Sequence, residues 1–249
     1  MSVNQRRRQK KLERLAAKRK ARHTALRRVK HRGLAERLAD AAAAPVLHCW
    51  VSSTRTAEGM RTVLLSRQLS GGNIAFAVFL VDLWCLGVKN AMGNVLSKGE
   101  YNAFLSRFRD RMEMVTTAPE DARKLVEGAV QYARDLGLEP HADYHRTKPI
   151  FGDIDTSQAT REFTFGQDGK PHFFAGPHDS PERCRQIIAI LQQRCGPDGF
   201  HYTIPVTRVP EEWLEGGKVV AFEEDEEADE EWDDEEDADE RPLRGLGGW

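Results

Sequence analysis

Three apolar segments in the first half of the chain have the composition of β-strands. Residues 46–53 and 60–69 are rich in residues that suit strands, and residues 74–81 are almost continuously apolar. Between the last two segments, the sequence SGGN at 70–73 has the composition of a hairpin turn, because glycine adopts a positive φ without steric cost. The pattern predicts a meander of three antiparallel strands, the last of them buried on both faces.

After residue 96 the apolar residues recur with the spacing of an α-helix. Residues 101–112 and 122–136 each place their apolar side chains on one helical face. Both follow the capping-box pattern, a hydroxyl residue three positions before a glutamate, at residues 97–100 and 117–120. Two amphipathic helices are therefore predicted, followed by a short helical turn at 142–148 that a proline ends.

The remaining apolar segments predict a second hairpin, a helix and a last strand. Residues 162–165 and 171–175 flank the Asp-Gly turn at 167–170, which favours a β-hairpin. A Ser-Pro pair and a glycine delimit a helix over 180–196, because proline suits the first helical position. Residues 200–206 then resemble a strand.

This order of strands and helices, joined by short connections, predicts an α+β fold rather than an alternating parallel sheet. We expect one compact domain at residues 45–215, with antiparallel hairpins or a meander and three main helices. A basic helical arm, partly disordered, is expected at residues 1–44, including a short helix at 34–44. An acidic disordered tail is expected at residues 216–249.

Charge is segregated between the two ends of the chain, although the net charge is only −2. Residues 1–38 carry fifteen lysines and arginines against two glutamates, whereas residues 223–240 carry fifteen acidic residues and no basic one. The arm is rich in residues that form helices well. Its apolar residues do not keep an unbroken heptad, which argues against a stable coiled coil and leaves that structure only as an alternative.

The basic arm is the main functional candidate, because closely spaced cations neutralise phosphates and release counterions. We expect RNA, the ribosome or DNA as its partner, without base stacking, since the arm has no aromatic residue. The acidic tail either contacts the arm within the chain and moderates this binding or only increases solubility. The predicted nucleic-acid-binding residues, hereafter the arm cations, are Arg6, Arg7, Arg8, Lys10, Lys11, Arg14, Lys18, Arg19, Lys20, Arg22, Arg27, Arg28, Lys30 and Arg32.

Cysteine usage and hydropathy point to a cytoplasmic protein. Cys49, Cys85, Cys184 and Cys195 are widely spaced in apolar stretches and form no CxxC pair, which is typical of buried thiols in a reducing compartment. The basic N-terminus lacks the apolar region of a secretory signal. The longest apolar run has eight residues, far below the ~20 of a membrane span, so no transmembrane segment is expected.

The most metal-like cluster is His141-x-Asp143-x-His145. On a helix, His141 and His145 would share one face four residues apart, but the glutamate of the HExxH motif is absent. A metal-dependent hydrolase or nuclease that uses these three residues is therefore an alternative to the binding protein. Histidine and aspartate are also common in exposed loops and caps, so we predict no cofactor and assign no catalytic residue.

Asp82 and Lys89 stand at the end of the most apolar strand. Charged groups beside so apolar a segment need partners, and each other is one solution. A nucleophilic Cys85 between them would need a nearby base, which the sequence does not place, so a structural ion pair or cap is favoured. No P-loop, GxGxxG, GxSxG, EF-hand or zinc-finger motif occurs. A protein–protein interaction module is the second alternative.

Overall fold

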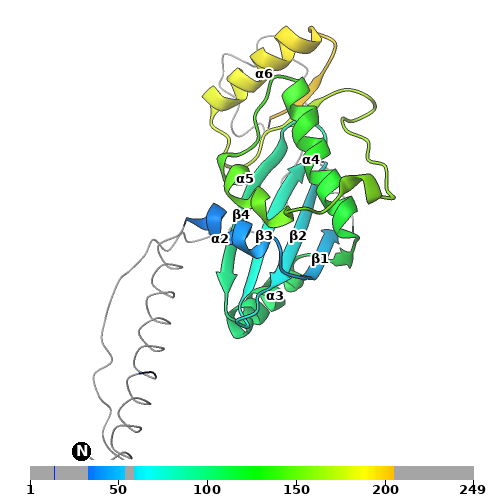
Figure 1. The fold of residues 1–249 in the computed structure, drawn as a ribbon. Coiled ribbons are helices and arrows are strands. Elements are labelled where there is room, and N and C mark those ends of the chain that lie inside the picture. Colours follow the sequence, from blue (N-terminus) through cyan, green and yellow to red (C-terminus); the bar gives the residue numbers. More distant parts are fainter. Residues whose placement is uncertain (1–13, 15–32, 54–58, 205–249) are drawn as a thin grey trace, which may run out of the picture.

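Both faces of the central β-strands are apolar, and the fold covers each face with helices. The computed structural model describes residue 14 and residues 33–53 and 59–204. Five antiparallel strands form one sheet in the order β4-β3-β2-β1-β5 (Figure 1). Their bounds are β1 Val46–Ser52, β2 Met60–Gln68, β3 Ile74–Asp82, β4 Gly87–Leu96 and β5 Met114–Thr116.

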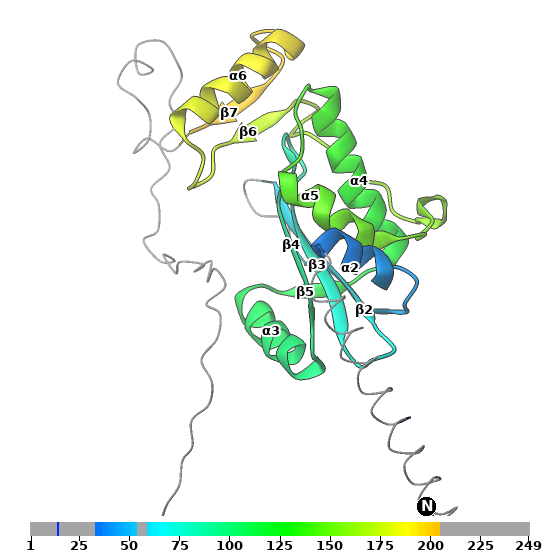
Figure 2. The same ribbon diagram turned by 60° about the vertical axis from the view of Figure 1, so that its left-hand side comes forward.

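Helices lie on both sides of this sheet (Figure 2). Helix α3 covers one face, and α2, α4 and α5 cover the opposite one. A smaller unit, in which the parallel strands β6 and β7 accompany α6, lies beyond the end of the sheet. The bounds are α2 Leu34–Ala41, α3 Lys98–Arg111, α4 Pro119–Asp135, α5 Ala142–Thr147, α6 Pro181–Cys195, β6 His172–Phe174 and β7 His201–Thr203, with 3₁₀ turns η1 Lys148–Phe151 and η2 Thr156–Gln158.

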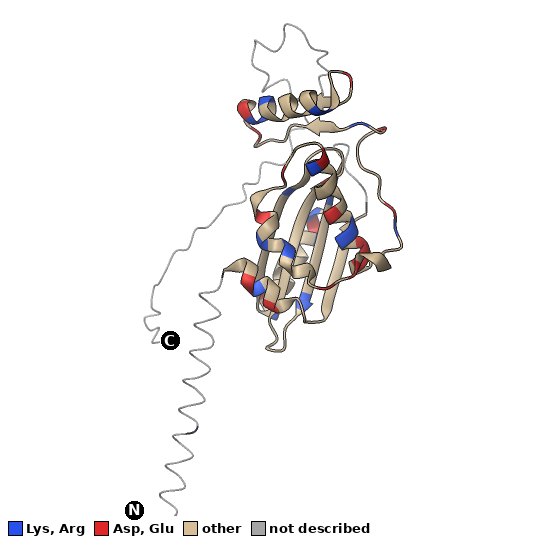
Figure 3. Cartoon of the chain, turned by 45° about the horizontal axis from the view of Figure 1, so that its top comes forward, with Lys and Arg blue, Asp and Glu red and all other residues tan. Residues whose placement is uncertain are grey.

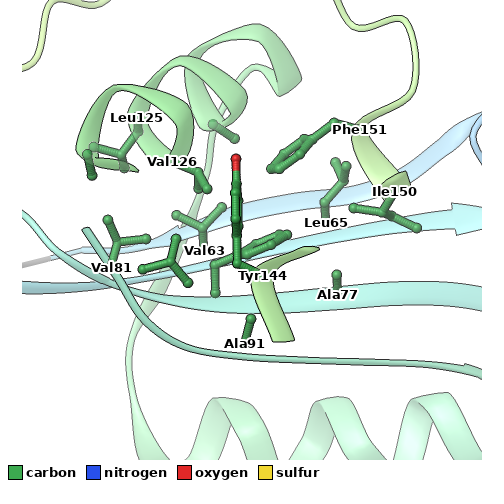
Figure 4. Packing of buried hydrophobic residues seen from close by; sticks show 14 of the residues in the cluster. Val63, Leu65, Ala77, Val81, Ala91, Leu125, Val126, Tyr144, Ile150 and Phe151 are labelled. Carbon is green, nitrogen blue, oxygen red and sulfur yellow. The ribbon is translucent and has the colours of Figure 1, made fainter. Parts of the chain in front are cut away.

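Strand β3 illustrates how a two-residue period serves two cores. Its residues Ala75, Ala77, Phe79 and Val81 face the helices α2, α4 and α5, while the alternate residues pack with α3. In the first core, Tyr144 of α5 stands among side chains of the sheet and of α4 (Figure 4). The predicted meander β1–β2–β3 is confirmed with its antiparallel pairing.

Helix α4 joins the main core to the smaller unit. Its Leu125, Val126 and Ala129 pack on the sheet, whereas Ala133, two turns after Val126, belongs to the cluster formed with β6 and α6. Close approach is needed where α4 passes β4. At Gly87, with φ of 69°, a Cβ atom would lie 2.8 Å from the carbonyl oxygen of Ala129. Glycine is therefore required at this position.

The fold class is confirmed as α+β, and several local expectations are confirmed with it. Ser97 and Glu100 form the predicted capping box of α3. The helical turn expected at 142–148 is α5, and Ser180 caps α6 at the predicted position. Helix α2 ends at Ala41, three residues earlier than expected, and it buries Leu38 and Ala41 in the core. No described helix is long and apolar enough to cross a membrane.

Two expectations about local structure need correction. The second capping box is absent, because Ala118 is the N-cap of α4 and the backbone N–H of Thr117 instead donates to Cys49 O of β1. The prediction of a second hairpin is also wrong. The Asp-Gly turn forms with positive φ at both residues, but a single bridge between Gln167 and Lys170 takes the place of two paired strands. Strand β6 instead pairs in parallel with β7, and neither β4 nor β5 was foreseen as a strand.

A buried arginine fixes the segments that close the first core. Arg67 of β2 is 4% exposed and donates to three backbone carbonyls. Its Nε bonds Ile150 O at 2.8 Å, Nη1 bonds Ala44 O at 2.6 Å and Nη2 bonds Phe151 O at 2.9 Å. The guanidinium therefore holds η1 and the connection after α2 against the sheet.

We predict that Arg67→Ala lowers the free energy of unfolding by about 3–5 kcal/mol, because three carbonyls lose their donor and a cavity remains. Urea unfolding followed by circular dichroism measures the change. Arg107→Ala on the exposed face of α3 is the matched control, with an expected effect of no more than about 0.5 kcal/mol. A loss below about 1 kcal/mol for Arg67→Ala would contradict the assigned role.

Candidate functional site, a pocket between β4 and α6

A pocket of about 160 Å³ opens where the main sheet meets the smaller unit. It lies between the start of β4, the connection from α4 to α5 and one side of α6. Apolar side chains and polar ones contribute equally to its walls. The lining residues are Leu86, Val88, Lys89, Leu138, Glu139, His141, Arg183, Gln186, Ile187 and Ile190.

The turn from β3 to β4, which precedes the pocket wall, is organised by the carboxylate of Asp82. Oδ1 accepts the backbone N–H of Trp84 at 2.8 Å and of Cys85 at 3.0 Å, and Oδ2 accepts that of Leu86 at 3.1 Å. Three amides that the sheet cannot satisfy thus gain an acceptor. The turn delivers Leu86 and then Lys89 to the pocket.

Asp82 itself is completely buried. Desolvation raises the pKa of its carboxyl group to about 6, against the lowering effect of the three backbone hydrogen bonds and of Lys89. The sequence left two roles open for Asp82, an ion pair with Lys89 or a cap, and the structure shows a cap of the turn. Asp82 satisfies the turn, and Lys89 pairs with Asp179.

Lys89 reaches out of β4 into the smaller unit. Its Nζ donates to Phe174 O at 3.2 Å and lies 3.4 Å from Oδ2 of Asp179. Gly176 allows this approach, since a Cβ atom there would lie 2.7 Å from Nζ. The same Asp179 oxygen accepts the Gly176 N–H at 2.8 Å. Lys89 therefore crosslinks β4 to the segment that leads from β6 into α6.

Arg183 adds a second cation from the first turns of α6. Its Nε lies 3.0 Å from Oδ1 of Asp179, so Asp179 bridges Arg183 and Lys89 with its two oxygens. Asp179 is only 10% exposed, whereas Arg183 is 53% exposed. Beyond Arg183, the buried Ile187 and the partly buried Ile190 continue the pocket wall along the helix.

His141 is the residue of the metal-like cluster that lines the pocket. It is the N-cap of α5, and its Nδ1 accepts the N–H of Asp143 at 3.3 Å. The backbone N–H of His141 donates to Val88 O at 2.9 Å, and this hydrogen bond joins α5 to β4. Because Nδ1 accepts a hydrogen bond, the neutral imidazole carries its proton on Nε2.

The structure does not place the other two members of this cluster in the pocket wall. Asp143 pairs with Arg146 at 3.1 Å and lies 3.6 Å from Nδ1 of His141. His145 packs its ring edge-on against Tyr144. His141 and His145 do not form a pair within the helix, because His141 precedes it as the cap. Among the described residues, no group of three or more His, Cys, Asp or Glu side chains is placed to hold a metal ion.

Cys85 is buried in the apolar cluster of the smaller unit, and burial raises the pKa of its thiol. Cys49 and Cys184 are also buried, Cys195 is partly buried, and none of the four forms a disulfide. His172 stacks on Trp84, and its ring nitrogens form hydrogen bonds with Thr203 at 2.8 Å and with Gln167. Burial lowers the pKa of His172, with a further contribution from His201.

The charged ends of the chain fall largely outside the described residues. Of the arm cations, only Arg14 is described, as a helical and exposed residue. The acidic residues 223–240 lie outside the described part as well. Sequence reasoning pointed to His141 and Lys89 but missed the pocket that joins them, since Asp179 and Arg183 carry no local motif.

Neither the family models, nor the curated proteins, nor the solved structures include a match to this chain.

We predict that the Asp82 carboxyl group lowers the free energy of unfolding as the pH rises from about 4 to about 6. Its folded pKa of about 6 exceeds the ordinary value of 3.8, so the folded state holds this proton more tightly than the unfolded state does. The stabilisation is complete below pH 4 and is lost as the carboxyl group ionises. Between pH 4 and pH 7 the loss amounts to roughly 3 kcal/mol.

Asp82→Asn isolates this contribution, because asparagine keeps the acceptor for Trp84 and Cys85 but does not titrate. The free energy of unfolding is measured for both proteins by urea titration at several pH values. The difference, wild type minus variant, should fall as the pH rises through this window. A difference that stays constant from pH 4 to pH 7 would show that Asp82 keeps an ordinary pKa.

Proposed function

We propose that the chain is a non-enzymatic binding protein that attaches to RNA, the ribosome or DNA through its basic N-terminal arm, with the acidic C-terminal tail moderating the attachment. One observation carries the proposal, the division of charge along the sequence. Residues 1–32 have a net charge of +13, residues 33–204 of −1 and residues 205–249 of −14. Nearly all the unbalanced charge therefore lies outside the folded domain.

The folded domain supports this division of labour because its own charges are balanced. Residues 33–204 contain nineteen basic and twenty acidic residues. Figure 3 shows the two signs interspersed over the helices. Local pairs such as Arg123 with Glu127 at 3.1 Å and Lys124 with Glu162 at 2.7 Å neutralise one another. The domain therefore has few uncompensated cations that could contact a phosphate backbone, whereas the arm has many.

Binding of this kind is electrostatic and independent of sequence. Each phosphate that a lysine or arginine neutralises releases condensed counterions, so affinity falls steeply with salt. Fourteen cations within thirty-two residues provide the needed density. The absence of aromatic side chains from the arm favours contact with the phosphate backbone over base stacking.

We predict that replacing all fourteen arm cations by Gln abolishes the salt dependence of nucleic-acid binding. Affinities of the full chain and the variant for a generic RNA hairpin and a DNA duplex are measured by fluorescence anisotropy between 50 and 300 mM salt. If the arm neutralises about six phosphates of duplex DNA, the plot of log affinity against log salt has a slope of about −5 for the wild type. The slope of the variant should be near zero.

A double variant, Lys98→Gln with Arg107→Gln, serves as the control, because both residues are exposed cations of the domain rather than the arm. Its affinity should stay within about twofold of the wild type. Equal affinity of the wild type and the arm variant at low salt would refute the proposal, as would a domain variant that weakens binding as strongly as the arm variant.

We predict that the tail lowers this affinity through competition. Its fifteen carboxylates at 223–240 are tethered to the arm in one chain and act as a local polyanion. Replacing these Asp and Glu residues by Asn and Gln should raise the affinity for RNA at low salt at least about tenfold and have less effect at high salt. An unchanged affinity at low salt would reduce the tail to a solubilising segment.

A further inference from the structure

We propose that the pocket between β4 and α6 binds a small monocarboxylic acid with a short apolar chain. The inference goes beyond the nucleic-acid binding proposed above and does not depend on it. It stands on three observations of described residues: the size of the pocket, the excess of hydrogen-bond donors around it, and the net charge of its built-in ion cluster.

Size restricts the ligand to a small molecule. The pocket volume is about 160 Å³, whereas pockets that hold drug-sized ligands start near 300 Å³. Five aliphatic side chains form the apolar part of the wall, so the buried part of the ligand is apolar. They are Leu86, Val88, Leu138, Ile187 and Ile190.

Donors outnumber acceptors among the polar lining groups. Phe174 O and Asp179 engage two of the three N–H groups of Lys89, which leaves one for a ligand. The neutral form of His141 has its proton on Nε2, because Nδ1 accepts from the α5 backbone. Arg183 uses Nε on Asp179 and retains its terminal N–H groups. A ligand that brings acceptors, such as a carboxylate, matches this set.

The charge of the cluster selects a monoanion. Lys89 and Arg183 contribute two positive charges, and Asp179 between them cancels one. Glu139, the other carboxylate of the lining, pairs with Arg134 at 3.3 Å and is 73% exposed, so that pair is neutral. One uncompensated positive charge beside an apolar wall fits a carboxylate with a hydrocarbon chain better than a doubly charged phosphate.

The test uses the full chain with isotope-labelled isoleucine methyl groups, titrated with sodium butanoate at constant ionic strength. Methyl resonances of Ile187 and Ile190 should shift saturably, while those of Ile74 and Ile150 in the other two clusters stay in place. 1-Butanol and butylammonium chloride are titrated in parallel. Their apparent affinity should be at least about tenfold weaker, since neither supplies an anionic acceptor.

Ile190→Trp fills the pocket from a partly buried position, and Ala189→Trp adds the same ring on the exposed side of α6 as its matched control. The first should abolish the shift of Ile187, and the second should preserve it. Arg183→Gln should weaken butanoate about tenfold, whereas Arg185→Gln, outside the pocket lining, should not. Circular dichroism confirms that each variant is folded.

The proposal is overturned if butanoate causes no saturable shift at Ile187, or if butanol and butylammonium bind as well as butanoate. It is also overturned if Ile190→Trp binds butanoate undiminished. Each of these results leaves the nucleic-acid proposal untouched, because that proposal is read out by salt-dependent anisotropy of the arm variants. The two functions are therefore tested separately.

Discussion

The apolarity of β2 and β3 on both faces is the constraint from which the architecture follows. A sheet with two apolar faces loses the benefit of burial unless both are covered, at about 25 cal/mol for each Å² left in water. The chain meets this demand by crossing one face with α3 between β4 and β5, and by laying α2, α4 and α5 on the other. Because α4 extends beyond the sheet, its last turns offer a second apolar surface, on which the smaller unit packs.

Buried charges then fix the connections that this layering leaves without regular partners. Arg67 gives three donors to carbonyls of η1 and of the segment after α2. Asp82 gives two acceptor oxygens to the β3–β4 turn, and Asp121 of α4 accepts the N–H groups of Thr160 and Arg161. Each buried ionic group is thus satisfied mainly by backbone atoms of an irregular segment, where an unpaired amide or carbonyl would be most costly. The loops are held by side chains of the regular elements.

The parts of the fold that the sequence predicted are those governed by local rules. Strands β1 to β3, the capping box at Ser97 and the cap of α6 each depend on residues within a few positions of one another. Strand β4 was not predicted, because its exposed side carries polar residues such as Asn90 and Asn94, which have low strand propensity. The parallel pairing of β6 with β7 joins residues 29 positions apart, such as His172 and His201, and only three residues of each strand take part. A hairpin was the more local alternative and was wrong.

The pocket was beyond sequence reasoning for the same reason. Lys89, His141 and Arg183 come from three elements that only the packing of α6 on α4 brings together. The described chain ends at Ile204, directly after β7, and Thr203 O of β7 accepts the N–H of Ala175, the neighbour of Gly176 beside Lys89. The contact between β7 and the segment after β6 therefore helps to hold Gly176 beside Lys89. The pocket thus depends on a parallel strand pairing that local sequence rules do not predict.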